Sequence, residues 1–140
     1  MASRSRAHGF TLIELLLVLA IIGIVAGIAI PAYLGQRRRA RVIGDAMANA
    51  KVIAMLLESR KADNGVYGTV QSYQWLSGSA VGSASALLPN FTPKGNSNMN
   101  YTVDIASSGL AYTITVTDPQ SSGQTAYQTD QSGAELARLR

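Results

Sequence analysis

A long apolar run near the N-terminus constrains this chain more than any other feature. Every residue from Leu15 to Ile30 is apolar or glycine, and the run extends back to Phe10 with only Thr11 and Glu14 as polar breaks. A helix over these 21 residues rises about 32 Å, which is enough to cross the ~30 Å hydrocarbon core of a bilayer. The sequence therefore predicts a membrane-spanning helix at residues 10–30.

The segment after the run favours a membrane anchor over a cleaved secretory signal. A signal peptide ends in a small-residue cleavage site, whereas this run leads through Pro31 into residues 36–61, which are again rich in helix formers. Orientation is less clear, because the basic cluster after the run outnumbers Arg4 and Arg6 before it and simple charge counting then places the N-terminus outside. The members of that cluster are Arg37, Arg38, Arg39 and Arg41.

Charge and reactive side chains are unevenly spread along the chain. Residues 35–61 carry seven basic and two acidic side chains, a net charge of +5, whereas residues 62–140 carry three basic and five acidic ones, a net charge of −2. The chain has no cysteine, and its single histidine is His8. The lack of cysteine excludes disulfides, iron–sulfur centres and thiol catalysis.

The residues around the start of the apolar run resemble a known family. The stretch GFTLIELLLVLAIIGIVAGIAIPAY is similar to the N-terminal segment of type IV pilins and of the related secretion-system pseudopilins. The resemblance implies that residues 1–9 are a leader peptide and that a membrane prepilin peptidase cuts between Gly9 and Phe10 and N-methylates Phe10. Pro31 falls where these subunits usually carry a proline. Members of the family insert with the leader in the cytoplasm, which would resolve the conflicting charge count.

Glu14 is the residue of this motif with the clearest physical argument. A carboxylate costs roughly 2.5–3.5 kcal/mol at the centre of a membrane helix and less near an interface, so it usually has a function and a partner. Cleavage would convert the Phe10 nitrogen into an ammonium group, and Glu14 of one subunit would then pair with Phe10 of its neighbour in a stack of helices. The alternative is that Glu14 only reaches the lipid headgroups.

Three residues within the run predict close packing or flexibility of the helix. Gly23 and Gly27 form a small-xxx-small pair that lets membrane helices approach closely, although glycine is also simply common in such helices. Pro31 removes a backbone donor and clashes with the preceding turn, which weakens the helix. The resemblance implies that this stretch loses helicity when a fibre assembles.

Residues 31–62 are predicted to continue the helix as an amphipathic stem, so that the whole helix covers residues 10–62. Apolar residues recur at three- and four-residue steps and predict one buried stripe of Ile43, Met47, Ala50, Ile53 or Ala54, and Leu57. The pair Asn64–Gly65 supplies an end signal. The arginine cluster is interpreted as a collar in water or against lipid headgroups, and nucleic acid is a less favoured partner because no aromatic residues are interleaved with it.

Residues 63–140 are predicted to form a β head that covers this stripe. Apolar residues alternate with polar ones, mostly threonine, at 101–105 and 112–116. A third strand is expected near 125–129, and a short strand or tail at 134–136. The expected fold class is α+β, in which a long helix packs against a three- or four-stranded antiparallel sheet. That arrangement is the pilin fold.

Between the stem and these strands, residues 65–100 are interpreted as a long loop rich in glycine, serine and asparagine. Loops of this length are unusual in a small domain and are normally functional or partly structured. Ser72–Leu76 is expected to form a short strand within it, and Leu87 and Leu88 are expected to anchor it to the core. Relatives often staple their C-terminal loop with two cysteines, so packing and hydrogen bonds must hold that loop in this chain.

The mature chain lacks the side chains that most enzymes use. Removal of residues 1–9 would also remove His8, which excludes Ser-His-Asp and His- or Cys-based zinc chemistry. The remaining carboxylates form no catalytic motif. Asp118 and Asp130 are interpreted as turn residues and not as Ca²⁺ ligands, because no dense acidic loop surrounds them. We therefore expect no catalytic, cofactor-binding or metal-binding residue and no enzymatic activity.

Two functions within the resembling family remain open. The favoured one is the structural subunit of a type IV pilus, and the alternative is a pseudopilin of a type II secretion system that forms a short periplasmic pseudopilus. The long segment 65–100 and the sparse acidic residues near the C-terminus favour the pilin. The implied partners are further copies of the chain, the prepilin peptidase and N-methyltransferase, the pilus assembly machinery and, before assembly, the bilayer. The implied location is the inner membrane first and then an extracellular filament used for adhesion or motility.

Overall fold

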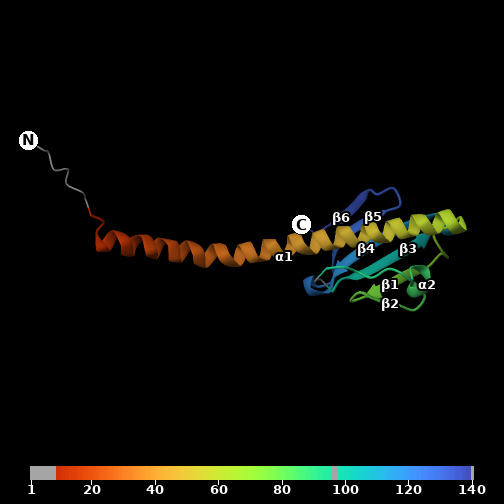
Figure 1. Cartoon of the computed structure of the whole chain (residues 1–140), viewed down its shortest axis with the longest axis horizontal. Helices are drawn as coiled ribbons and strands as arrows, with labels where there is room; N and C mark the ends of the chain where they lie inside the picture. The colour runs from red at the N-terminus through yellow and green to blue at the C-terminus, as the bar shows by residue number, and fades with distance from the viewer. Residues whose placement is uncertain (1–8, 96–97, 140) are drawn as a thin grey trace, which may run out of the picture. The chain divides into compact units, whose positions relative to one another are not determined.

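The computed structural model describes residues 9–95 and 98–139, and the chain divides into two compact units, residues 1–38 and 39–140. One helix, α1 (Leu12–Asn64), contributes to both units, and all other elements belong to the second (Figure 1). Those elements are β1 (Ser72–Leu76), β2 (Ser79–Val81), α2 (Ala84–Leu87), β3 (Asn100–Ala106), η1 (Ser107–Gly109), β4 (Ala111–Asp118), η2 (Pro119–Ser121), β5 (Gln124–Asp130) and β6 (Glu135–Arg138).

In the first unit, α1 carries apolar side chains on every face. From Phe10 to Leu34 all the large apolar side chains are exposed, with exposed fractions that range from 43% for Val18 to 76% for Leu12. Among the described residues, α1 is the one helix long and apolar enough to cross a membrane, with a mean hydropathy of 2.9 over an 18-residue window. A helix that is apolar all round needs an apolar environment that this unit does not itself provide.

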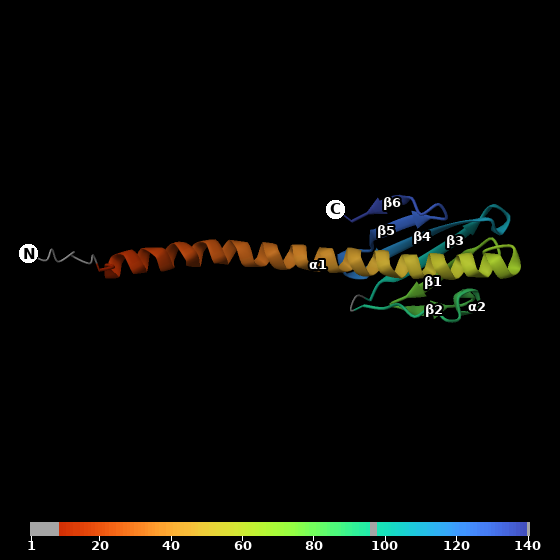
Figure 2. The same ribbon diagram turned by 45° about the horizontal axis from the view of Figure 1, so that its top comes forward.

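The second unit is built around a six-stranded antiparallel sheet with the strand order β2-β1-β3-β4-β5-β6. The strands β3 to β6 form the meander that the alternating pattern predicts, and in the register of β3 and β4 Val103 lies opposite Ile114. Figure 2 shows β5 and β6 to one side of α1 and the β1–β2 hairpin with α2 to the other. The α+β prediction is therefore confirmed, with a larger sheet than the three or four strands expected.

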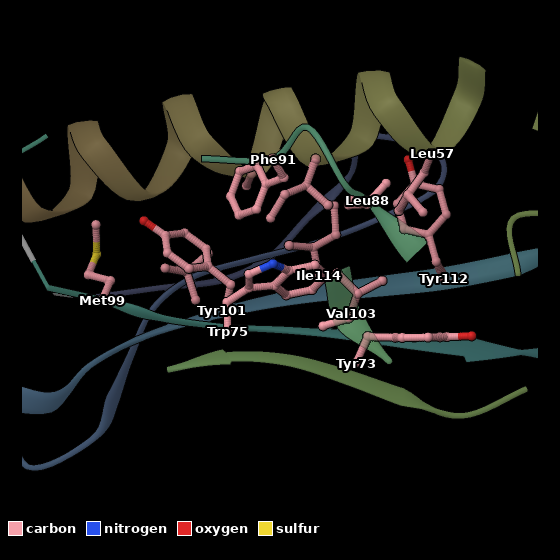
Figure 3. Close-up of a cluster of buried hydrophobic side chains, with 14 of the residues drawn as sticks. Leu57, Tyr73, Trp75, Leu88, Phe91, Met99, Tyr101, Val103, Tyr112 and Ile114 are labelled. Atoms are coloured by element: carbon pink, nitrogen blue, oxygen red, sulfur yellow. The ribbon is translucent and has the colours of Figure 1, made fainter. Parts of the chain in front are cut away.

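One face of this sheet packs against residues 39–64 of α1 to form the core. Figure 3 shows Leu57 of the helix directed toward the sheet, while Trp75, Tyr101 and Ile114 point from their strands toward the helix. Phe91 closes the layer from the segment before β3, and its ring makes edge-on contacts with Trp75 at 5.5 Å and Tyr101 at 5.6 Å between centroids. Each fully buried apolar side chain of this kind contributes about 1.5–3 kcal/mol to folding.

The buried stripe of α1 is displaced by about one residue at its N-terminal end from the predicted one. Ala50, Ile53 and Leu57 are buried as expected, but Ile43 and Met47, which were predicted to be buried, are only partly buried. The buried side chains of the helix are Val42, Ala46, Asn49, Ala50, Ile53 and Leu57. Apolar residues stand at two adjacent positions in this part of the helix, and a period of 3.6 residues does not decide which of the two faces the sheet.

The helix ends at Asn64, at the predicted Asn64–Gly65 end signal and two residues beyond the expected boundary at residue 62. The backbone N–H of Gly65 donates a hydrogen bond to the Lys61 carbonyl at 2.8 Å, and Gly65 adopts a φ of +79°. A residue in the left-handed region is the usual end of a helix, and glycine adopts that conformation without a steric penalty. The chain then turns back to begin covering the sheet.

The segment 65–100, predicted as a long loop, contains β1, β2 and α2. Ser72–Leu76 is a strand, as predicted, and Leu87 and Leu88 are buried, also as predicted. Asn49 fastens the rest of the segment to α1, because its side-chain amide donates to the Lys94 carbonyl at 2.8 Å and accepts from the Lys94 N–H at 3.0 Å. The same amide donates to the Tyr101 hydroxyl at 2.9 Å. These hydrogen bonds satisfy the buried Asn49 amide and attach the backbone at Lys94 to α1.

Candidate assembly and processing site

Thr11 and Glu14 form a reciprocal hydrogen-bonded cap at the start of α1. Glu14 Oε2 accepts hydrogen bonds from the Thr11 backbone N–H at 3.0 Å and from the Thr11 hydroxyl at 2.9 Å. The Thr11 hydroxyl oxygen in turn accepts from the Glu14 backbone N–H at 3.3 Å. This arrangement is a capping box, in which threonine and a glutamate three residues later satisfy the free N–H groups of the first turn. The T-x-x-E spacing is its sequence signal, which our prediction overlooked.

The cap uses only one of the two carboxylate oxygens of Glu14. Both bonds from Thr11 end on Oε2, and within residues 9–95 and 98–139 none ends on Oε1. A carboxylate accepts several hydrogen bonds, so the second oxygen is available to another donor. The structure of one chain therefore places Glu14 at the helix start with an acceptor to spare.

The predicted cleavage junction precedes the capped helix. Gly9 and Phe10 lie outside α1, and the Phe10 side chain is 74% exposed. A Cβ added at Gly9 would meet no atom within 4 Å, so the chain itself imposes no need for glycine here. Any requirement for a small residue at this position must come from a partner. The rest of the predicted leader, residues 1–8, lies outside the described residues.

Gly23, Gly27 and Pro31 all lie inside α1, which continues as a helix through the proline. A Cβ added at either glycine would meet no atom within 4 Å, so neither glycine is required by a contact within the chain. The structure does not bring these residues to a partner. Their roles in close packing and flexibility stay predictions.

The C-terminal turns are held by aspartates, as predicted. Asp118 accepts from the Gln120 N–H at 3.0 Å and from the Ser121 hydroxyl at 2.7 Å. Asp130 accepts from the Ser132 hydroxyl at 2.6 Å, and this bond lowers the pKa of the Asp130 carboxyl. Each aspartate therefore holds its own turn. Within the described part of the chain, no group of three or more His, Cys, Asp or Glu side chains is placed to hold a metal ion.

The start of the chain matches a known family. Residues 4–30 match the family described as the prokaryotic N-terminal methylation motif. This match includes the Gly9–Phe10 junction, the capping box and the whole apolar run. No solved structure was found to match the chain.

Curated relatives match up to about half of the chain. Fimbrial protein Q of Moraxella bovis is 46% identical over 56 residues, which are 37% of this chain and 36% of the relative. Type IV major fimbrial protein FimA of Dichelobacter nodosus is 40% identical over 73 residues, 49% of this chain and 46% of the relative. Type II secretion system core protein G of Pseudomonas aeruginosa is 37% identical over 68 residues, 49% of this chain and 47% of the relative.

The chain spans less than half the length of each of these relatives. The family they define is structural and non-enzymatic, in agreement with the expectation for this chain. Residues 4–30 therefore carry the prokaryotic N-terminal methylation motif, and the chain is a homologue of type IV pilins and type II secretion pseudopilins.

Proposed function

We propose that this chain is the precursor of a type IV pilin that polymerises into a filament through α1. The precursor is cut between Gly9 and Phe10, Phe10 is N-methylated, and the mature chain waits in the membrane until it joins the fibre. The partners of this process are other copies of the chain, the prepilin peptidase with its N-methyltransferase activity, and the assembly machinery in the membrane. The filament is extracellular.

The observation that carries this proposal is the exposed apolar surface that begins at the capped helix start. Every large apolar side chain from Phe10 to Leu34 is exposed, and the second unit has a buried core of its own. A surface of this size is covered by lipid, by other helices, or by each in turn. A subunit that moves from the bilayer to a fibre needs lipid around this surface first and the helices of other subunits afterwards.

Glu14 supplies the register of the proposed fibre. The carboxylate oxygen that the capping box leaves free would accept from the Phe10 ammonium of a neighbouring subunit. Two charges that are each costly in an apolar bundle then compensate each other, and an incoming subunit is favoured at one height only.

A pseudopilin of a type II secretion system is the second candidate. It rests on the similarity to core protein G, which covers as much of this chain as the similarity to FimA does. The pilin is preferred because four of the five relatives are fimbrial proteins or pilins.

Shearing of cells that express the chain tests the proposal directly. We expect long surface filaments by electron microscopy, and an intact mass that corresponds to a chain starting at N-methylated Phe10. Assemblies found only in the periplasm would favour the pseudopilin instead. Filaments composed of the full 140-residue chain would contradict the processing step.

A further inference from the structure

A groove in the second unit combines apolar, aromatic and acidic side chains. It encloses about 290 Å³ between α1, the β4 and β5 strands and the turn that follows β5. The residues that line it are Ala50, Lys51, Ala54, Met55, Glu58, Tyr112, Tyr127, Thr129, Asp130, Gln131, Ser132 and Gly133. We call it the side groove.

Two carboxylates line the side groove, and in each of them a single oxygen accepts the hydrogen bonds that fix the side chain. Glu58 Oε1 accepts from the Tyr67 hydroxyl at 2.8 Å and, weakly, from the Tyr112 hydroxyl at 3.5 Å. Asp130 Oδ1 accepts from Ser132 and Ala134. In the described part of the chain, Glu58 Oε2 and Asp130 Oδ2 receive no hydrogen bond. Each carboxylate is therefore fixed in position and still able to accept from a ligand.

Tyr127 adds an accessible hydroxyl to the side groove. Its side chain is only 5% exposed, yet its hydroxyl has no hydrogen-bond partner among the described residues. The hydroxyl is not among the fully enclosed polar atoms without a partner, which in those residues are Arg60 Nε and Trp75 Nε1. The hydroxyl therefore stays accessible, and Tyr127 is one of the residues that line the side groove. This hydroxyl can therefore donate to, or accept from, a group that enters the groove.

The lining defines the chemistry of the ligand. Ala50, Ala54 and Met55 offer an apolar surface, and the tyrosine rings and two carboxylates favour a cation. Lys51 is the one cation among the lining residues, and its side chain is exposed at the helix surface. A long side chain with an apolar stem and a planar charged head fits this lining best. Arginine has that form and bonds carboxylates through two N–H groups at once.

The chain itself supplies such an arginine. Arg41 is exposed, lies in the same unit as the side groove, and has no hydrogen-bond or ion-pair partner among the described residues. It cannot reach the groove of its own chain, because it precedes Ala54 by 13 residues of the same helix, about 20 Å. We propose that the side groove binds Arg41 of a second copy of this chain in the filament.

The direction of the required displacement agrees with the pairing at the helix start. Phe10 of a neighbour meets Glu14, four residues further along the chain, which corresponds to a displacement of about 6 Å toward the C-terminal end of the helix. Arg41 of a neighbour meets a groove centred about 13 residues further along, a displacement of about 20 Å in the same direction. In a fibre of parallel subunits that are displaced stepwise along their helices, a more distant neighbour satisfies the second contact. The inference rests on the proposed function, since it requires a fibre.

Cysteine pairs test this contact sharply, because the chain has no native cysteine. The variant R41C/M55C places one thiol at the arginine position and one at an exposed residue of the side groove. These positions are 14 helical residues, about 21 Å, apart in one chain. A disulfide requires Cα atoms within about 7 Å, so any disulfide must join two chains. We expect sheared, oxidised fibres to give a ladder of covalent oligomers that reductant collapses to a monomer.

A matched control pair is R41C/S79C, because Ser79 is also exposed but lies on β2, at the opposite edge of the sheet from β5 and β6. We expect no ladder from this control. Fibres of R41C/M55C that assemble but give no ladder would overturn the groove contact and leave the proposed function intact. A wild-type chain that forms no fibre at all would overturn the proposed function first.

A charge variant covers the case in which the cysteine variants fail to assemble. Glu58→Gln keeps an oxygen that accepts from Tyr67 and removes only the charge. We expect about a tenfold fall in sheared fibre, as for loss of a close charge pair, with the second unit still folded by the fluorescence of its single tryptophan, Trp75. The control Glu135→Gln removes an exposed carboxylate of β6 that does not line the groove and should leave the yield unchanged. Equal yields from the two variants would overturn the proposal.

Discussion

Residues 12–34 and residues 39–64 belong to one helix, yet they obtain their stability from different sources. The first stretch exposes every large apolar side chain that it has, whereas the second buries Ile53 and Leu57 completely against the sheet. The first therefore depends on lipid or on other copies of the chain, and the second depends on its own fold. Changes in the first stretch should affect processing and assembly and leave the second unit folded. Changes in the second should act on stability first.

The largest effect is expected at the cleavage junction. Gly9→Val should stop processing completely, because the implied peptidase site admits only a small residue before the cut, while the chain itself leaves space for a side chain at Gly9. The intact mass of the membrane-bound protein reports the result. The matched control Gly35→Ala, at another open glycine, should be processed normally. Fibres that still carry residues 1–9 would show that assembly does not require cleavage after Gly9.

The second largest effect is expected at Glu14, where one substitution should block assembly without blocking membrane insertion. Glu14→Leu should enter the membrane and be processed, because it removes a costly carboxylate, but it should form no filaments. An unpaired Phe10 ammonium in an apolar bundle costs on the order of 3–5 kcal/mol by analogy with broken buried ion pairs. Processing is measured by mass and filaments by electron microscopy.

Glu14→Gln is the control that distinguishes charge from capping. Glutamine at this position still completes the capping box with Thr11, because its side-chain oxygen accepts the same hydrogen bonds. We expect this variant also to lack filaments. Normal filaments from Glu14→Gln would show that Glu14 acts through the helix cap and not through its charge.

The second unit should fold without the first. A fragment that begins at Gln36 keeps the buried stripe, all six strands and the Asn49 contacts, so it should be soluble, monomeric and insensitive to reductant. Circular dichroism and size-exclusion chromatography report these properties. A fragment without secondary structure would show that the second unit also depends on its neighbours.

A matched pair of leucines tests the comparison within α1. Leu57→Ala should lower the free energy of unfolding of the second unit by about 2–5 kcal/mol, because Leu57 is fully buried in the core. Leu17→Ala makes the same chemical change at an exposed position and should leave that unfolding transition unchanged. Trp75 is the only tryptophan and is 1% exposed, so its fluorescence in detergent-solubilised full-length chain follows this unit alone.

The smallest effect concerns high pH. Burial raises the pKa of Tyr101 to about 12 and also raises the pKa of Tyr112, whose hydroxyl lies near Glu58. The unfolded chain, with tyrosine pKa values near ~10, therefore loses these protons first. Stability should be constant below about pH 10 and fall as the pH rises from there toward 12. Urea unfolding of the fragment at pH 8, 10 and 11 measures this, and equal midpoints would contradict it.

The sequence pattern predicted the strands that have one buried face and one exposed face. The alternation of Tyr101, Val103 and Ile105 with polar residues predicts β3 because one face of that strand is buried and the other is not. The strand β2 was missed, since all three of its residues are exposed and it carries no such alternation. The hydrogen bonds between the Asn49 side chain and the Lys94 backbone were also not predicted, because the two residues are 45 positions apart and no local spacing links them.

The candidate site was predicted in part for a similar reason. The identity of the motif residues is local, so Gly9, Phe10 and Glu14 could be named from the sequence. The capping box is equally local, and its signal is the T-x-x-E spacing of Thr11 and Glu14, but our prediction considered only partners of Glu14 outside its own helix turn. The side groove could not be predicted at all, since it joins α1 to strands and a turn more than 50 residues further on.

The capping box has a consequence for the subunit before it joins a fibre. A lone carboxylate in a membrane helix tends to pull its helix toward water or to recruit whatever donor is at hand. Here Thr11 solvates one oxygen of Glu14 from within the same turn, so the waiting subunit carries a built-in substitute for part of its future partner. This solvation would lower the free-energy cost of holding the subunit of the proposed fibre in the bilayer before it assembles. In the proposed fibre, the Phe10 ammonium of a neighbouring subunit would then add to hydrogen bonds that Glu14 already accepts.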